Sequence, residues 1–128
     1  MVENEKQGLI RLDIDDDAGG ILAYAIDDGE ILDTDADWIW ARFDAAKSEG
    51  NKLRIFAEMH ALPHFHAGLV MEKLKRFGTL LTTIDRIAVV GDQGWLDVYA
   101  KIANPITPFD IRHFTLEDRQ AAIDWVRS

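Results

Sequence analysis

The sequence contains no cysteine, which excludes disulfide bonds, thiolate nucleophiles, zinc ribbons and iron–sulfur clusters. It also lacks long hydrophobic runs, whereas a membrane-spanning helix needs about 20 consecutive apolar residues. The first residues, Met1 to Lys6, are mixed in charge and contain no apolar core of a secretion signal. We therefore expect a cytoplasmic protein without integral membrane association.

Positive charge is scarce. The chain has 14 Lys and Arg residues against 23 Asp and Glu residues, so its formal net charge is -9. Its densest basic group consists of only Lys73, Lys75 and Arg76. Such a surface repels phosphate backbones and anionic lipid headgroups at long range. Nucleic-acid binding and electrostatic docking to membranes are therefore not expected.

Length and composition indicate a single domain over residues 1–128. Hydrophobic residues make up 48% of the chain and charged residues 29%, which is an ordinary balance for a globular protein. A chain of this length buries roughly two thirds of its unfolded surface, so its core needs no disulfide or metal. The sequence has no internal repeat and no linker long enough to divide it.

The chain opens with a predicted β-hairpin. In residues 8–15 the apolar side chains alternate with polar ones, which places Ile10, Leu12 and Ile14 on one face of a strand. A turn rich in Asp and Gly follows. Residues 21–27 then form the returning strand.

Strands and helices alternate in the rest of the sequence. The predicted strands are 52–59, 85–90 and 109–114, and the predicted helices are 36–48, 66–83, one that begins after Asp92, and 116–127. The order ββαβαβαβα is typical of an α/β domain with a mostly parallel sheet and helices packed on it. The run 85–90 is almost entirely apolar, which predicts a strand buried on both faces.

Two helix starts carry capping signals. Asp92 is predicted to cap the helix that begins after it. Thr115 and Asp118 have the spacing of a capping box, with Asp in place of the usual Glu.

Two stretches of the sequence carry a family resemblance. The run from Asp85 to Trp95 ends in Gly-Asp-Gln-Gly-Trp and leads into an amphipathic helix and a bridge that contains proline. The run from Ile111 to Trp125 is a last strand followed by a helix that ends in Ala-x-x-Trp. Both resemble the SpoIIAA-like proteins, bacterial relatives of the STAS domain (anti-sigma-factor antagonist) fold. The resemblance covers nearly the whole chain.

The resemblance implies a single STAS-like α/β domain with a regulatory or ligand-binding role and no catalysis. That fold is similar to the CRAL-TRIO (Sec14-like) lipid-binding domain, in which an apolar ligand sits between helices and sheet. Antagonists of anti-sigma factors also carry a phosphorylatable serine in the loop before the second helix. Here that loop, residues 60–66, contains no Ser or Thr, and the only serines are Ser48 and Ser128. The phosphoserine switch is therefore not expected.

The predicted ligand site follows from this comparison and from topology. The connector 60–66 and the two helices after it meet at the carboxyl ends of the central strands, where ligands bind in open α/β sheets. The apolar residues expected to wall the pocket are Leu69, Val70, Phe77, Trp95 and Tyr99. The alternative is that these side chains fill an ordinary core. We expect the occupant to be a small apolar ligand or a protein partner.

The candidate site also contains a cluster of possible metal ligands, Glu58, His60, His64 and His66. Three of the four histidines fall within seven positions, and imidazole with carboxylate binds Zn²⁺, Ni²⁺ or Cu²⁺. The alternative function is therefore a small metal-binding hydrolase or sensor. Against it, Pro63 breaks the helical spacing of His60 and His64, and the histidines can hydrogen-bond locally or respond to pH. No cofactor motif is present.

Trp38 is the predicted contact with a partner protein or a second copy of the chain. Helical spacing places it opposite the apolar face formed by Ile39, Phe43 and Ala46. Exposed aromatic side chains are enriched at protein interfaces.

Overall fold

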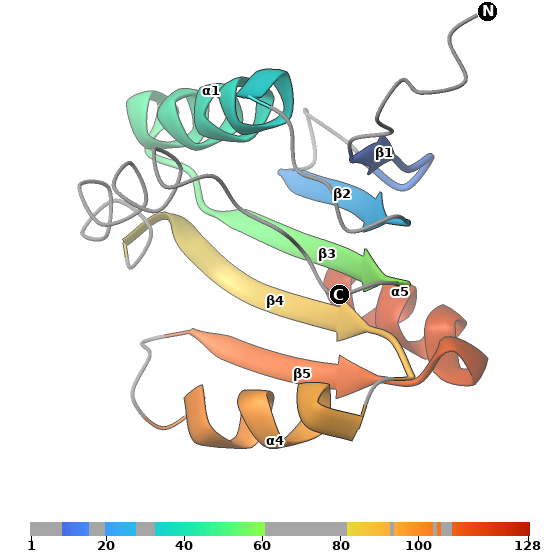
Figure 1. The fold of residues 1–128 in the computed structure, drawn as a ribbon. Helices are drawn as coiled ribbons and strands as arrows, with labels where there is room; N and C mark the ends of the chain where they lie inside the picture. Colours follow the sequence, from blue (N-terminus) through green and yellow to red (C-terminus); the bar gives the residue numbers. More distant parts are fainter. Residues whose placement is uncertain are drawn as a thin grey trace, which may run out of the picture.

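A computed structural model describes residues 9–15, 20–27, 33–60, 82–92, 94–103, 105 and 109–128. The described elements follow the predicted order (Figure 1). They are β1 (Ile10–Arg11), β2 (Ile21–Ile26), α1 (Asp33–Glu49), β3 (Leu53–Met59), β4 (Ile84–Val90), α4 (Gly94–Ala103), β5 (Asp110–Phe114), the short 3-10 helix η2 (Leu116–Asp118) and α5 (Arg119–Arg127). The predicted helix over 66–83 lies outside the described residues, except that its last residues, Thr82 and Thr83, are helical.

The five strands form one mixed sheet in the order β1-β2-β3-β4-β5. β1 is antiparallel to β2, and every other neighbouring pair is parallel. The predicted parallel sheet with an N-terminal hairpin is therefore confirmed. None of the helices in the described ranges is long and apolar enough to cross a membrane.

The first strand is shorter than the sequence predicts, because a buried carboxylate ends it. The backbone turns at Leu12, whose carbonyl accepts a hydrogen bond from the N–H of Asp15. The Asp15 side chain then accepts bonds of 2.8 and 2.9 Å from Arg42 of α1, and a 3.0 Å bond from the N–H of Ala23 in β2. Arg11 donates to the same carboxylate. This network joins the hairpin to α1.

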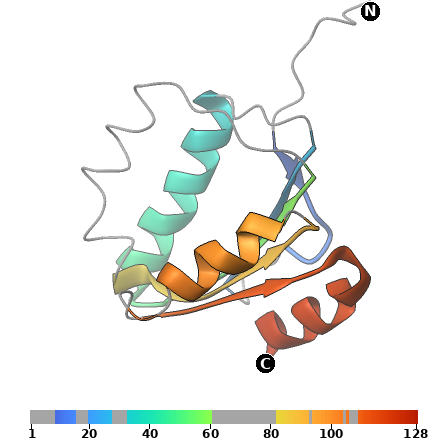
Figure 2. The ribbon, with the colours of Figure 1, turned by 60° about the horizontal axis from the view of Figure 1, so that its bottom comes forward.

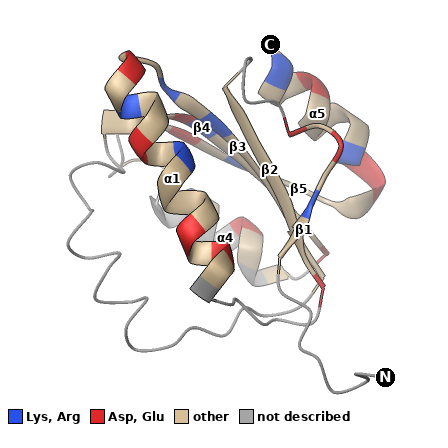
Figure 3. Cartoon of the chain, turned by 90° about the horizontal axis from the view of Figure 1, so that it is seen from above, with Lys and Arg blue, Asp and Glu red and all other residues tan. Residues whose placement is uncertain are grey.

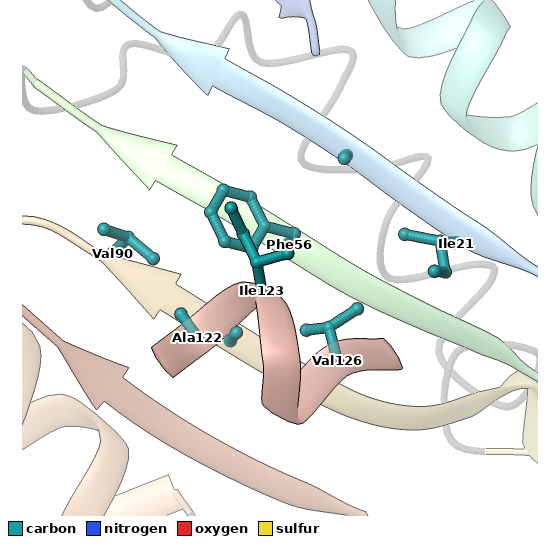
Figure 4. Packing of buried hydrophobic residues seen from close by; sticks show 8 residues of the cluster. Ile21, Phe56, Val90, Ala122, Ile123 and Val126 are labelled. Carbon is teal, nitrogen blue, oxygen red and sulfur yellow. The ribbon is translucent and has the colours of Figure 1, made fainter. Parts of the chain in front are cut away.

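Helices cover both faces of the sheet (Figure 2). α1 and α4 lie on one side and α5 lies on the other. The core on the α5 side is shown in Figure 4, where Ile123 of α5 packs with Phe56 of β3. The buried members of this core are Ile21, Ala23, Phe56, Ala88, Val90, Ala122, Ile123 and Val126. The core on the α1 side contains Leu22, Phe43, Ala46, Leu53, Ile55 and Ile84.

α5 runs antiparallel to the strands it covers, and arginines of the sheet bind its last carbonyls. Arg54 of β3 donates to the carbonyl oxygens of Val126 and Arg127. Arg86 of β4 donates to the carbonyl oxygen of Trp125. Cations near a helix C-terminus also offset the negative end of its dipole. These bonds place the first turn of α5 at the opposite edge, where the parallel strands end.

The predicted capping box at Thr115 is not observed, and Asp92 has a partner that the sequence did not suggest. Thr115 makes no side-chain capping bond, and η2 precedes α5 instead of a capping box. The Asp92 carboxylate accepts a 2.9 Å bond from the N–H of Leu116, so it ties the end of β4 to η2. Spacing along the chain could not reveal this donor, which lies 24 positions away.

The prediction that β4 is buried on both faces is wrong, because Asp85, Arg86, Ile87 and Val89 are all only half-buried. Ala88 and Val90 face α5 and are fully buried. Ile87 and Val89 face the side of α1 and α4 and are only half-buried. On that side Ile84 is buried in the α1 core, Ile87 packs against this core as a partly buried residue, and α4 packs on β5.

Candidate functional site

A buried carboxylate lies at the carboxyl end of β3. Glu58 is only 8% exposed, and strand alternation places it on the α5 face together with Phe56. One of its oxygens accepts a 2.6 Å hydrogen bond from Nε2 of His60, and the other accepts a 2.5 Å bond from Nε of Arg119. His60 directly follows β3, and Arg119 is the first residue of α5. We call these three residues the Glu58 cluster.

The Glu58 cluster has a defined charge. Burial raises the pKa of the Glu58 carboxyl group, but the hydrogen bonds and charges of Arg119 and His60 outweigh this effect and hold the pKa below its ordinary value. Glu58 is therefore ionised at neutral pH. Because an ionised carboxylate only accepts hydrogen bonds, Nε2 of His60 carries a proton. The cluster thus contains an Arg–carboxylate ion pair at its centre.

Arg119 is held on two sides. Besides its bond to Glu58, its guanidinium carbon lies 5.6 Å from the centre of the Phe56 ring, within the range of a cation–π contact. Its side chain is 41% exposed and that of His60 is 36% exposed, so both remain accessible from solvent.

The sheet separates the predicted site residues into two groups. Glu58 and His60 lie on the α5 face, whereas Trp95 and Tyr99 belong to α4, which packs on β5 from the opposite face. The remaining predicted residues, His64, His66, Leu69, Val70 and Phe77, lie outside the described residues. The structure therefore brings Glu58 and His60 together but does not join them to α4.

Sequence reasoning missed Arg119. It lies 61 positions after Glu58, and a single arginine at a helix start has no distinguishing pattern. The one available signal was topological, because a helix after the last parallel strand returns across the sheet and begins near the strand ends.

Two of the four residues of the predicted metal site, Glu58 and His60, are among those that the structure describes. Within the ranges that the structure describes, no group of three or more His, Cys, Asp or Glu side chains is arranged to hold a metal. Glu58 and His60 already bind each other, and the third member of their cluster is a cation. The role of His64 and His66 stays a prediction.

An apolar strip lies on the other face of the sheet. It consists of Tyr24, Met59, Ile87 and Val89, all half-buried residues of the central strands. Burial raises the pKa of the Tyr24 phenol to about 12, so this group is neutral at physiological pH. Tyr24 and Ile87 of the strip pack against the α1 core, and Met59 and Val89 extend the strip along the same face of β3 and β4.

A small open groove follows β5 and α4. It has a volume of about 190 Å³ and is lined by Asp97, Ala100, Lys101, Ile111, Arg112, His113 and Phe114. A ring nitrogen of His113 lies 2.6 Å from the Gly91 carbonyl oxygen, and Asp97 and Lys101 form an ion pair at 2.9 Å. The hydrogen bond from Lys101 holds the pKa of Asp97 below its ordinary value. The groove's polar groups thus already have partners from the protein.

The predicted exposure of Trp38 on a polar helix face is wrong. Trp38 packs against the α1 core and meets Tyr24 edge to face, with ring centres 6.5 Å apart. Arg11 of the hairpin lies 5.3 Å from its ring centre. The hairpin covers this side of α1, which a helical wheel cannot show. A partner contact through Trp38 stays a prediction.

Acidic and basic residues are interspersed along α1 and α5 (Figure 3). This distribution agrees with the absence of a long basic run in the sequence.

Comparisons with known proteins agree on the fold. The family model described as SpoIIAA-like matches residues 21–127. A crystal structure of an uncharacterised protein from Shewanella loihica PV-4, of the DUF3478 family with a SpoIIAA-like fold, is similar to this chain with a TM-score of 0.62. The two are 19% identical, and the similarity covers 93% of this chain and 90% of the other. None of the curated proteins matches the sequence.

Proposed function

Because the chain belongs to the SpoIIAA-like family, we propose that it is a non-catalytic regulatory or ligand-binding module whose occupant is a small apolar ligand. The proposed binding surface is the apolar strip of Tyr24, Met59, Ile87 and Val89. The resemblance to lipid-binding CRAL-TRIO domains stays a prediction, and it favours the same location between helices and sheet.

The observation that carries the proposal is the unequal burial of β4. On its α5 face Ala88 and Val90 are both 0% exposed, while Ile87 and Val89 on the other face are half-buried. Water contact with apolar side chains of an inner strand is unfavourable. An apolar molecule that covers Ile87 and Val89 removes this contact, which supplies a driving force for binding.

The character of the strip favours an apolar occupant over an ion. None of its four side chains is charged at neutral pH, and its one polar group is the neutral phenol of Tyr24. Ligand pockets are typically lined by apolar and aromatic side chains with few polar groups.

Native mass spectrometry of untagged protein, purified without nickel or chelator, tests the proposal. We expect an added mass of a few hundred daltons that is released on denaturation. The added mass of a single transition-metal ion, removed by EDTA, would favour the alternative metal-binding hydrolase or sensor. A bare protein that also fails to bind the apolar dye anilinonaphthalene sulfonate saturably would contradict a small apolar ligand and direct attention to protein partners.

Neighbouring valines of β4 provide a matched pair of variants. Val89→Thr places a hydroxyl group on the strip, so it should weaken ligand or dye binding several-fold while the protein stays folded. Val90→Thr buries the same hydroxyl against α5 and should lower the free energy of unfolding by about 1–3 kcal/mol without weakening binding. Equal binding by both variants would show that the occupant does not lie on Val89.

A further inference from the structure

We propose a second binding site on the opposite face, in which the terminal guanidinium nitrogens of Arg119 bind the carboxylate of a small molecule beside Glu58. This site rests on the Glu58 cluster and does not depend on the apolar strip. It lies at the carboxyl ends of the parallel strands, where open α/β sheets bind their ligands.

Glu58 leaves the terminal nitrogens of Arg119 available for a ligand. Its carboxylate accepts from Nε of Arg119 and from Nε2 of His60. The two terminal nitrogens of Arg119 make no hydrogen bond with the described residues. Together they form a planar fork that matches the two oxygens of a carboxylate. The 41% exposure of this side chain lets a ligand reach the fork.

The guanidinium group of Arg119 is held in place before a ligand arrives. Glu58 binds the guanidinium through Nε, and the Phe56 ring lies 5.6 Å from the guanidinium carbon. An arginine fixed in this way loses less conformational entropy on binding than a free surface arginine does. Arg127 of the same helix is exposed and has no such contacts among the described residues, so it provides a natural comparison.

Acidic side chains around the site limit the charge of the ligand. Exposed carboxylates of Asp92, Glu117 and Asp118 lie near the start of α5, and Asp92 is bonded to η2 directly. With Glu58 they disfavour a second negative charge at this edge of the sheet. The site therefore suits a singly charged, planar carboxylate better than a phosphate dianion.

The test is a titration of isotope-labelled protein with sodium benzoate, followed by NMR at neutral pH and constant ionic strength. We expect saturable shifts of the Arg119 Nε–H signal and of amide signals near residues 58–60 and 118–120. Phosphate should bind more weakly. Shifts that grow linearly without saturating would overturn the site, and phosphate binding as tight as benzoate binding would overturn its preference for a carboxylate.

Two variants identify the fork. Arg119→Lys keeps the positive charge beside Glu58 but removes the paired nitrogens, so the dissociation constant for benzoate should rise about tenfold. Arg127→Gln removes an exposed arginine of the same helix and should leave that constant unchanged. If both variants weakened binding equally, benzoate would be responding to overall charge and the proposal would be wrong.

Glu58→Gln separates binding from a purely structural role of the cluster. Glutamine has nearly the same shape and still accepts from Arg119, but it removes the competing negative charge. Benzoate should then bind several-fold more tightly. A structural ion pair alone predicts no such gain, so unchanged or weaker binding by this variant would contradict the site. The two proposals can fail independently, because Val89→Thr tests the apolar strip and these variants test the Arg119 site on the opposite face.

Discussion

Glu58 shows how a single buried residue can link stability to pH. Its pKa in the folded protein lies below the ordinary glutamate value of 4.5, so the unfolded state binds the proton more tightly. Its contribution to stability is therefore complete above pH 4.5 and is lost as the pH falls through the lower, folded-state pKa.

The lowered pKa of Glu58 leads to a prediction for the Glu58→Gln variant, because the glutamine amide does not titrate. We expect the wild type to have a higher free energy of unfolding than the variant, with the largest difference at neutral pH. This difference in free energy should shrink as the pH falls below 4.5. Urea unfolding of both proteins from neutral pH into the acid range measures it. A difference that stays constant over this range would mean that Glu58 has the same pKa in the folded and unfolded states.

At the scale of the element, α5 depends on one tightly packed face and on polar contacts at its two ends. Ala122, Ile123 and Val126 supply the buried face, and Ala122 is 0% exposed against the sheet. Its neighbour Ala121 is exposed. Both alanines lie in the same helix, so substitutions there share the same change in helix propensity.

We therefore predict different effects of the same substitution at adjacent positions. Ala122→Leu forces a larger side chain against β4 and should lower the free energy of unfolding by about 1–3 kcal/mol. Ala121→Leu should change it by no more than about 0.5 kcal/mol. Chemical denaturation of the two variants compares them directly. Similar losses at both positions would contradict the observed orientation of α5.

At the scale of the whole molecule, the excess of negative charge dominates. A formal net charge of -9 destabilises the compact state through self-repulsion. Raising NaCl from about 0.01 M to about 0.15 M shortens the screening length from about 30 Å to about 8 Å. We predict that the melting temperature rises over this range, as measured by circular dichroism. A fall would show that ion pairs such as Asp15–Arg42 outweigh the net repulsion.

Most of the architecture could be predicted, because its signals are local. The Asp- and Gly-rich turn before residues 21–27 and the helical spacing in 36–48 depend only on near neighbours in the chain, and they predicted β2 and α1 to within a few residues. The boundaries that failed involve distant partners. β1 ends early because Asp15 binds Arg42, which is 27 positions away, and the hydrogen bond from Leu116 to Asp92 spans 24 positions.

The candidate site was predicted in part, for the same reason. Glu58 and His60 stand two positions apart at a strand end, so their proximity follows from local geometry. The sequence by itself thus determined the order of elements, the family and two of the three members of the Glu58 cluster. Only the tertiary structure decided that Arg119 completes this cluster, that the sheet separates it from α4, and that Val89 stays half-buried, because each depends on which face of the sheet a distant helix covers.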